Sequence, residues 1–123
     1  MEKLKNTMTF EGASFRKLDA RESRPEASWK VGALNDVTYA ELKDIFGEPT
    51  INTASGDNKV QVEWAIEVVE GDSIYELRIY DWKTYDRHET LTSLKTWSIG
   101  GTDEANPYLL KCFVREQQLI HYF

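Results

Sequence analysis

Two stretches of alternating apolar and polar residues constrain the fold most, because a period of two is typical of β-strands with one buried face. In residues 60–68, valine, tryptophan and isoleucine alternate with polar or small residues, and residues 75–80 alternate in the same way. The sequence Glu70-Gly71-Asp72 between them supplies a hairpin turn. We therefore predict a long antiparallel hairpin whose valine-rich face belongs to the core. Its opposite face should carry Glu63, Glu67, Arg78, Tyr80 and Trp82.

That opposite face has two interpretations. Faces open to solvent favour Lys, Glu and Thr over Trp, so a mixture of aromatic rings and charges indicates a binding surface. Alternatively, another layer of the protein, such as the N-terminal segment, covers the face. The alternation itself does not choose between them.

Capping signals predict a short helix near residue 40. Thr38 and Glu41 fit a capping box, in which each side chain bonds the other residue's backbone N–H group. Val37 and Leu42 fit a hydrophobic staple, and Gly47 can take the left-handed conformation that ends a helix.

A second helix is predicted near the C-terminus. Asn106 is a suitable N-cap, Pro107 stands in the favoured first position, and apolar residues continue at helical spacing to about Leu119. An earlier start, near Asp103, is an alternative.

Shorter signals complete the predicted architecture. Residues 7–18 fit a small hairpin around Gly12, residues 29–34 and 95–99 fit short strands, and residues 19–28 and 84–94 fit loops. At 123 residues the chain has the usual size of one domain. We predict a single α+β domain spanning residues 1–123, with an antiparallel sheet of about five or six strands, one short helix and one C-terminal helix.

Charge and cysteine content exclude several classes of function. The net charge is −6 and no basic stripe is visible, so direct nucleic-acid binding is not expected. Cys112 is the only cysteine, so an internal disulfide and a cysteine-based metal cluster are excluded. No signal peptide and no membrane-spanning stretch is apparent in the sequence. We expect a cytoplasmic protein that does not associate with a membrane.

The sequence contains no recognisable catalytic motif. His88 and His121 have no partner at a metal-binding spacing, and nucleophile-elbow, P-loop and dinucleotide-binding glycine patterns are absent. Twenty-one acidic residues offer many carboxylate pairs, so this number has no specificity for acid–base catalysis. We therefore expect a binding protein that has neither enzymatic activity nor a metal or other cofactor.

Aromatic and cationic residues suggest a nucleotide site. A base could stack on Trp82 or Trp97 while Arg78 and Lys83 contact phosphates. The Gly100-Gly101 pair could let the backbone approach an anion, although a tight strand-to-helix turn explains the glycines equally well. The predicted ligand-binding residues are Arg78, Tyr80, Trp82, Lys83, Trp97, Gly100, Gly101 and Arg115.

Several motifs occur in an order that resembles a known family. They are Leu42 with Phe46-Gly47-Glu48-Pro49, Lys59-Val60 through Glu63-Trp64, Ile79-Tyr80-Asp81-Trp82-Lys83, and Trp97-Ser98-Ile99-Gly100-Gly101. Over roughly residues 29–110 the chain resembles the first Thoeris anti-defence family of phage proteins. The resemblance implies a homo-oligomeric sponge that sequesters cyclic ADP-ribose signals, or related cyclic nucleotides, inside the infected bacterial cell.

The resemblance carries over only to Trp82, Lys83, Trp97 and the Gly100-Gly101 pair. Arg78 departs from the smaller residue that the family pattern suggests, and residues 84–94 fall in a variable loop. Both differences leave the preferred ligand open.

The leading hypothesis is a phage counter-defence protein that binds a cyclic nucleotide without cleaving it. The main alternative is an acidic inhibitor that occupies the nucleic-acid channel of a host defence effector, in the manner of an anti-CRISPR protein. That alternative predicts one acidic surface formed by Glu63, Glu67, Glu70, Asp72 and Glu76. A third hypothesis is a small phosphodiesterase or glycohydrolase.

Overall fold

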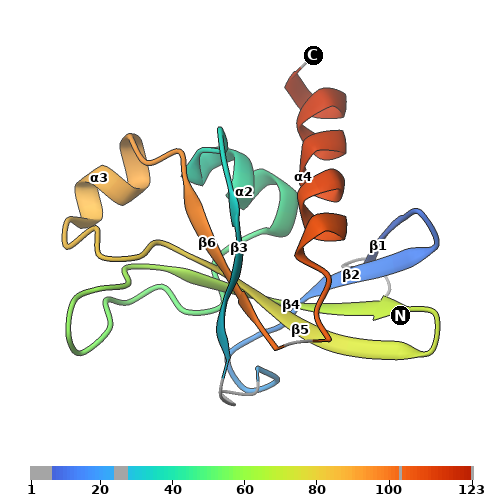
Figure 1. Cartoon of the computed structure of the whole chain (residues 1–123). Coiled ribbons are helices and arrows are strands. Elements are labelled where there is room, and N and C mark those ends of the chain that lie inside the picture. The colour runs from blue at the N-terminus through green and yellow to red at the C-terminus, as the bar shows by residue number, and fades with distance from the viewer. Residues whose placement is uncertain (1–6, 24–27, 103, 123) are drawn as a thin grey trace.

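A computed structural model describes residues 7–23, 28–102 and 104–122 of the chain (Figure 1). It confirms the predicted α+β class, with a six-stranded sheet and a C-terminal helix. The strands are β1 (Thr7–Phe10), β2 (Ala13–Lys17), β3 (Trp29–Leu34), β4 (Glu63–Glu70), β5 (Ser73–Tyr80) and β6 (Trp97–Gly101). The helices are α2 (Tyr39–Phe46), α3 (Arg87–Thr92) and α4 (Pro107–Tyr122).

The sheet has the order β1-β2-β4-β5-β6-β3, and every pair of neighbouring strands is antiparallel. The predicted β4–β5 hairpin lies in its middle and pairs Glu63 with Tyr80 at one end and Glu70 with Ser73 at the other. On the far side of β5, Ile79 pairs with Ile99. This register decides which β6 residues face the core.

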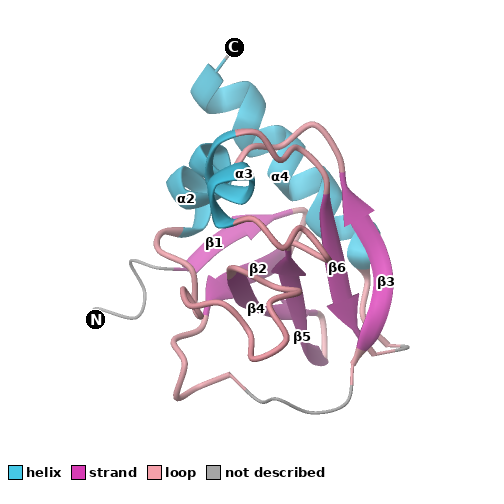
Figure 2. Ribbon diagram, turned by 90° about the vertical axis from the view of Figure 1, so that its left-hand side faces the viewer, coloured by secondary structure: helices cyan, strands magenta, loops and turns pink. Residues whose placement is uncertain are grey.

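The inner face of the sheet packs against α2 and α4, which lie together on one side of it (Figure 2). The rings of Phe15 and Phe113 stack with their centroids 4.4 Å apart, and Trp64 meets Trp97 edge-on at 5.7 Å. Fully buried side chains of this core include Phe15, Leu42, Trp64, Ile66, Leu77, Ile79, Trp97, Ile99, Leu110 and Phe113.

Both predicted caps form. The hydroxyl of Thr38 accepts from the N–H group of Glu41 at 3.2 Å, and the carboxylate of Glu41 accepts from the N–H group of Thr38 at 2.9 Å. At the start of α4, the side-chain oxygen of Asn106 accepts from the N–H group of Leu109 at 3.2 Å. The alternative start near Asp103 concerns a residue outside the described ranges.

Three local predictions are wrong. Strand β4 begins at Glu63, because the N–H groups of Gln61 and Val62 donate to the Asp81 carboxylate instead of to a strand. Residues 84–94 are predicted to form a loop, but they contain helix α3. The side chain of Asp86 caps this helix, and the helix has no apolar stripe that would indicate it in the sequence. Strand β6 includes Gly100 and Gly101, which pair with Lys30 and Trp29 of β3.

The outer face of the sheet, opposite α2 and α4, carries Glu63, Glu67, Glu76, Arg78 and Tyr80. The segment after β2 covers part of this face. Leu18 is 4% exposed, and Ser23 Oγ donates to Glu76 on β5 at 3.1 Å. Of the two interpretations of this face, the one in which an N-terminal segment covers it holds in part, for residues 18–23, whereas residues 24–27 lie outside the described ranges.

Candidate functional site

The exposed indole of Trp82 is the centre of the candidate site. Trp82 lies just beyond β5, after Asp81, and is 50% exposed, although indole rings have a strong tendency to be buried. The ring of Tyr80 meets it edge-on, with centroids 6.2 Å apart and an interplanar angle of 88°. One side of the indole is therefore held by Tyr80, and half of its surface faces solvent.

Two lysines lie over this indole. The Nζ atom of Lys59 is 5.6 Å from the ring centroid and that of Lys83 is 5.8 Å from it. Cation–π contacts at exposed sites contribute about 0.5–1 kcal/mol each. We call Trp82, Tyr80, Lys59 and Lys83 the Trp82 cluster.

The backbone brings the two lysines together. The N–H group of Lys83 donates to the carbonyl oxygen of Lys59 at 2.8 Å, which joins the loop before β4 to the loop after β5. Lys83 has a φ of 58°, in the left-handed region that residues other than glycine rarely occupy. This turn of the chain directs Lys83 back toward Trp82.

The Trp82 cluster is positive among the described residues. No carboxylate oxygen in the described ranges lies within ion-pair distance of Lys83, and Lys59 approaches only Asp57, at 4.0 Å. A hydrogen bond from Ser55 Oγ lowers the pKa of Asp57. The cluster thus combines a half-exposed aromatic ring with two ammonium groups that lie over it.

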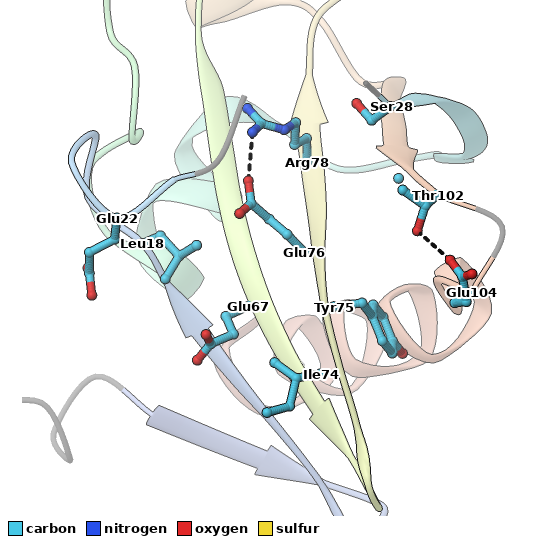
Figure 3. Close-up of a pocket in the computed structure, with 11 residues that line it drawn as sticks. Leu18, Glu22, Ser28, Glu67, Ile74, Tyr75, Glu76, Arg78, Thr102 and Glu104 are labelled. Atoms are coloured by element: carbon cyan, nitrogen blue, oxygen red, sulfur yellow. Dashed lines mark hydrogen bonds and ion pairs between the residues drawn. The ribbon is translucent and has the colours of Figure 1, made fainter. Parts of the chain in front are cut away.

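A separate hollow of about 470 Å³ lies on the outer face of the sheet (Figure 3). Its size is within the range of small-molecule pockets. Strands β4, β5 and β6 supply its floor, and the segment after β2 supplies one wall. Its lining residues are Leu18, Glu22, Ser28, Glu67, Ile74, Tyr75, Glu76, Arg78, Gly101, Thr102 and Glu104.

Carboxylates dominate the charge of this hollow. Among the described residues of the lining, Arg78 is the one cation, and its guanidinium nitrogens lie 2.6 Å from Glu63 and 2.7 Å from Glu76. Arg16 beside it pairs with Glu22 at 2.9 Å and with Glu67 at 3.4 Å. The hydrogen bond with Glu22 raises the pKa of Arg16. An anionic ligand would have to displace these carboxylates, so the hollow is a poor phosphate site.

The structure places the predicted ligand residues in several different parts of the fold. Tyr80, Trp82 and Lys83 meet in the Trp82 cluster, whereas Arg78 is held by carboxylates on the outer face. Arg115 lies on the exposed side of α4 beside a shallow hollow with Phe10 and Leu119, on the other side of the sheet. The structure does not bring Arg115 to Trp82.

Trp97 and the glycine pair are corrected to packing roles. Trp97 is 1% exposed and its indole N–H donates to the carbonyl oxygen of Val37 at 2.8 Å, so no Trp82/Trp97 pair forms. A Cβ atom on Gly100 would lie 3.1 Å from Tyr80, and one on Gly101 would lie 3.0 Å from Leu77. The glycines therefore allow close packing within the sheet, and they do not form the predicted anion-binding turn.

Lys59 is the site residue that sequence reasoning missed. It falls in a loop far from Trp82 along the chain, and its charge alone does not distinguish it from other lysines. The available signal was its place in the Lys59-Val60 motif of the family resemblance.

The carboxylates of the acidic alternative do not form one surface. Glu63, Glu67 and Glu76 share the outer face, where Arg16 and Arg78 pair with them. Glu70 points to the inner side and accepts from Tyr75 at 2.8 Å. The clustering that this alternative predicted is not present.

Three further findings concern membrane spans, metal sites and similarity to known proteins. Within residues 7–23, 28–102 and 104–122, no helix is long and apolar enough to cross a membrane, and no group of His, Cys, Asp or Glu is arranged to hold a metal ion. Comparison with protein-family models, with curated proteins and with solved structures found no match.

Proposed function

We propose that the protein binds a small phosphorylated nucleotide at the Trp82 cluster and holds it without cleaving it. The observation that carries this proposal is the half-exposed indole of Trp82 with the ammonium groups of Lys59 and Lys83 at 5.6 Å and 5.8 Å from its centroid. A base would stack on the indole, and its phosphates would contact the two lysines. Tyr80 would keep the indole in place by its edge-on contact.

The energies of these contacts suit a binding protein. Stacking of a base on an aromatic side chain contributes about 1–3 kcal/mol. A hydrogen bond to a charged group contributes about 1.5–3 kcal/mol. One stack and two phosphate contacts at the upper end of these ranges sum to about −9 kcal/mol, which exceeds the roughly −8 kcal/mol that corresponds to micromolar affinity.

The motifs that resemble the first Thoeris anti-defence family indicate the ligand class. Two of them, around Lys59 and around Trp82, contribute residues to the Trp82 cluster. We therefore propose cyclic ADP-ribose or a related cyclic nucleotide as the ligand. In this proposal the chain is a homo-oligomeric phage protein that sequesters an immune signal in the cytoplasm of the infected bacterium.

A retention experiment tests binding without cleavage. The purified protein is equilibrated with cyclic ADP-ribose isomers by dialysis, so that bound nucleotide is measured at equilibrium, and the small molecules released on heating the protein compartment are identified by mass spectrometry. We expect the nucleotide to be released intact, as in a control heated without protein. Release of a hydrolysed product would indicate an enzyme, and retention of no nucleotide by the folded protein would contradict the proposed binding.

A further inference from the structure

The carboxylate of Asp81 is buried directly before Trp82 in the chain. Asp81 is 0% exposed, and burial of a carboxylate is unfavourable unless hydrogen bonds satisfy it. Its Oδ1 atom accepts from the N–H groups of Gln61 at 2.8 Å and of Val62 at 3.0 Å. One oxygen of Asp81 thereby fixes the loop that contains Lys59 to the end of β5.

The second oxygen of the same carboxylate fixes the other loop. Asp81 Oδ2 accepts from the hydroxyl groups of Thr84 and of Thr90, the latter at 2.8 Å. Thr90 is the buried residue of α3, and its hydroxyl also lies 3.1 Å from that of Thr84. The segment from Trp82 to α3 is therefore held against the Asp81 carboxylate by these two threonines.

The two loops need such an anchor because their backbone is strained. Asn58, Lys83 and Tyr85 all have left-handed φ angles, of 61°, 58° and 56°. Residues other than glycine keep this conformation only when the surrounding structure imposes it. The cross-loop contacts from Lys83 N–H to the Lys59 carbonyl and from Asn58 Nδ2 to the Tyr85 carbonyl depend on that geometry.

We infer that Asp81 is the positioning residue of the Trp82 cluster. Its carboxylate holds the loops before β4 and after β5 in the one arrangement that places Lys59 and Lys83 over the same indole. Asp81 acts through these residues and does not contact the ligand. The inference rests on the proposed nucleotide binding, but its structural part is measurable without any ligand.

The substitution Asp81→Asn separates positioning from charge by the sign of its effect. It removes a negative charge close to the site of a phosphorylated ligand, so electrostatics alone predicts tighter binding. Positioning predicts weaker binding, because an amide nitrogen can only donate, so both threonine hydroxyls must turn from donor to acceptor and neutral hydrogen bonds replace the charge-assisted ones, while the amide oxygen keeps both backbone donors. We expect affinity about tenfold lower, in the middle of the range for residues coupled through one hydrogen-bond network.

Gln118→Leu provides a matched control. Gln118 is buried and donates to the Asp36 carbonyl and to the Glu41 carboxylate, in a polar network that involves α4 and lies outside the Trp82 cluster. Its removal should lower the melting temperature without changing nucleotide affinity. Thr90→Val removes one donor to Asp81 and serves as a milder variant if Asp81→Asn does not fold.

The experiment measures cyclic ADP-ribose affinity by calorimetry and, in ligand-free protein, the NOE contacts from Lys59 and Lys83 methylenes to the Trp82 ring. We expect the NOE contacts in the wild type and in Gln118→Leu, and their loss or weakening in Asp81→Asn and in Thr90→Val. Unchanged NOE contacts in both Asp81 network variants, or unchanged or tighter binding there, would overturn the inference. If the wild type itself does not bind, the proposed function fails while the NOE comparison still decides the role of Asp81.

Discussion

The cations near β5 have two different environments. Arg78, within the strand, lies between Glu63 and Glu76 at 2.6 Å and 2.7 Å on a face that the segment after β2 partly covers. Lys83, beyond the end of the strand, lies over the half-exposed ring of Trp82. The difference shows that neighbours, and not charge, decide whether a cation stabilises the sheet or is available to a ligand.

The largest expected effect concerns the cation within the strand. Arg78→Met leaves Glu63 and Glu76 without the guanidinium that they share. The Arg78 side chain is only 12% exposed, so water screens this pairing little. We expect a loss of about 3 kcal/mol in the free energy of unfolding, the lower end of the range for broken buried pairs. Urea denaturation checks this value.

A solvent-exposed ion pair is the control for Arg78→Met. Lys43 and Glu48 lie 3.1 Å apart with side chains that are 47% and 62% exposed, so Lys43→Met should cost no more than about 0.5 kcal/mol. If Arg78→Met left stability unchanged but abolished nucleotide binding, the hollow of the outer face would be the site and the comparison would fail.

The next largest effect concerns the indole. Trp82→Ala removes the stacking surface, and we expect nucleotide affinity to fall by about 2 kcal/mol, or about thirtyfold, with little change in stability. Trp29→Ala is the matched control, because Trp29 is 49% exposed whereas Trp82 is 50% exposed. Calorimetric titration of both variants should separate them, and equal losses would speak against a specific stack on Trp82.

A smaller effect is expected from the two lysines. The double substitution Lys59→Gln and Lys83→Gln should weaken binding by about 1 kcal/mol and reduce the dependence of affinity on salt, because each glutamine amide can still donate a hydrogen bond to phosphate but carries no charge. The matched control is the double substitution Lys95→Gln and Lys111→Gln, which removes the same amount of charge at two other exposed lysines. A salt dependence that stays the same in the first pair would assign the phosphate contacts to other groups.

The smallest effect concerns the carboxylate nearest to Lys59. The Ser55 hydroxyl donates to Asp57 at 2.6 Å and is the main cause of its lowered pKa. Ser55→Ala should therefore move the pKa of Asp57 upward, toward its ordinary value, in an NMR titration of the carboxyl carbon. A pKa that does not rise would show that the backbone N–H group of Lys59 is sufficient to hold the carboxylate.

Local signals made most of the fold predictable from the sequence. The capping box at Thr38 and Glu41, the cap at Asn106 and the alternation along β4 and β5 each depend on neighbouring residues alone. Helix α3 was missed because its start depends on the Asp86 cap and only Thr90 is buried, so no apolar period marks it.

The site was less predictable because long-range contacts decide it. Trp82 and Lys83 could be identified from their sequence, but the burial of Trp97 follows from the pairing of Ile79 with Ile99, which no local pattern reveals. The position of Lys59 depends on its contact with Lys83 across the two loops. The pairing of Arg78 with carboxylates likewise depends on the register between strands.

The most direct test of the account follows the indole N–H signals of the tryptophans during titration with cyclic ADP-ribose. In the structure, Trp64 donates to the Gly47 carbonyl and Trp97 to the Val37 carbonyl, so both serve as internal references in the core. The account predicts a saturable shift of the Trp82 signal while the signals of Trp64 and Trp97 stay in place. Ser28 and Arg78 line the hollow of the outer face. Binding at the Trp82 cluster would be contradicted if titration to saturation shifted the amide signals of these two residues and left the Trp82 signal unchanged.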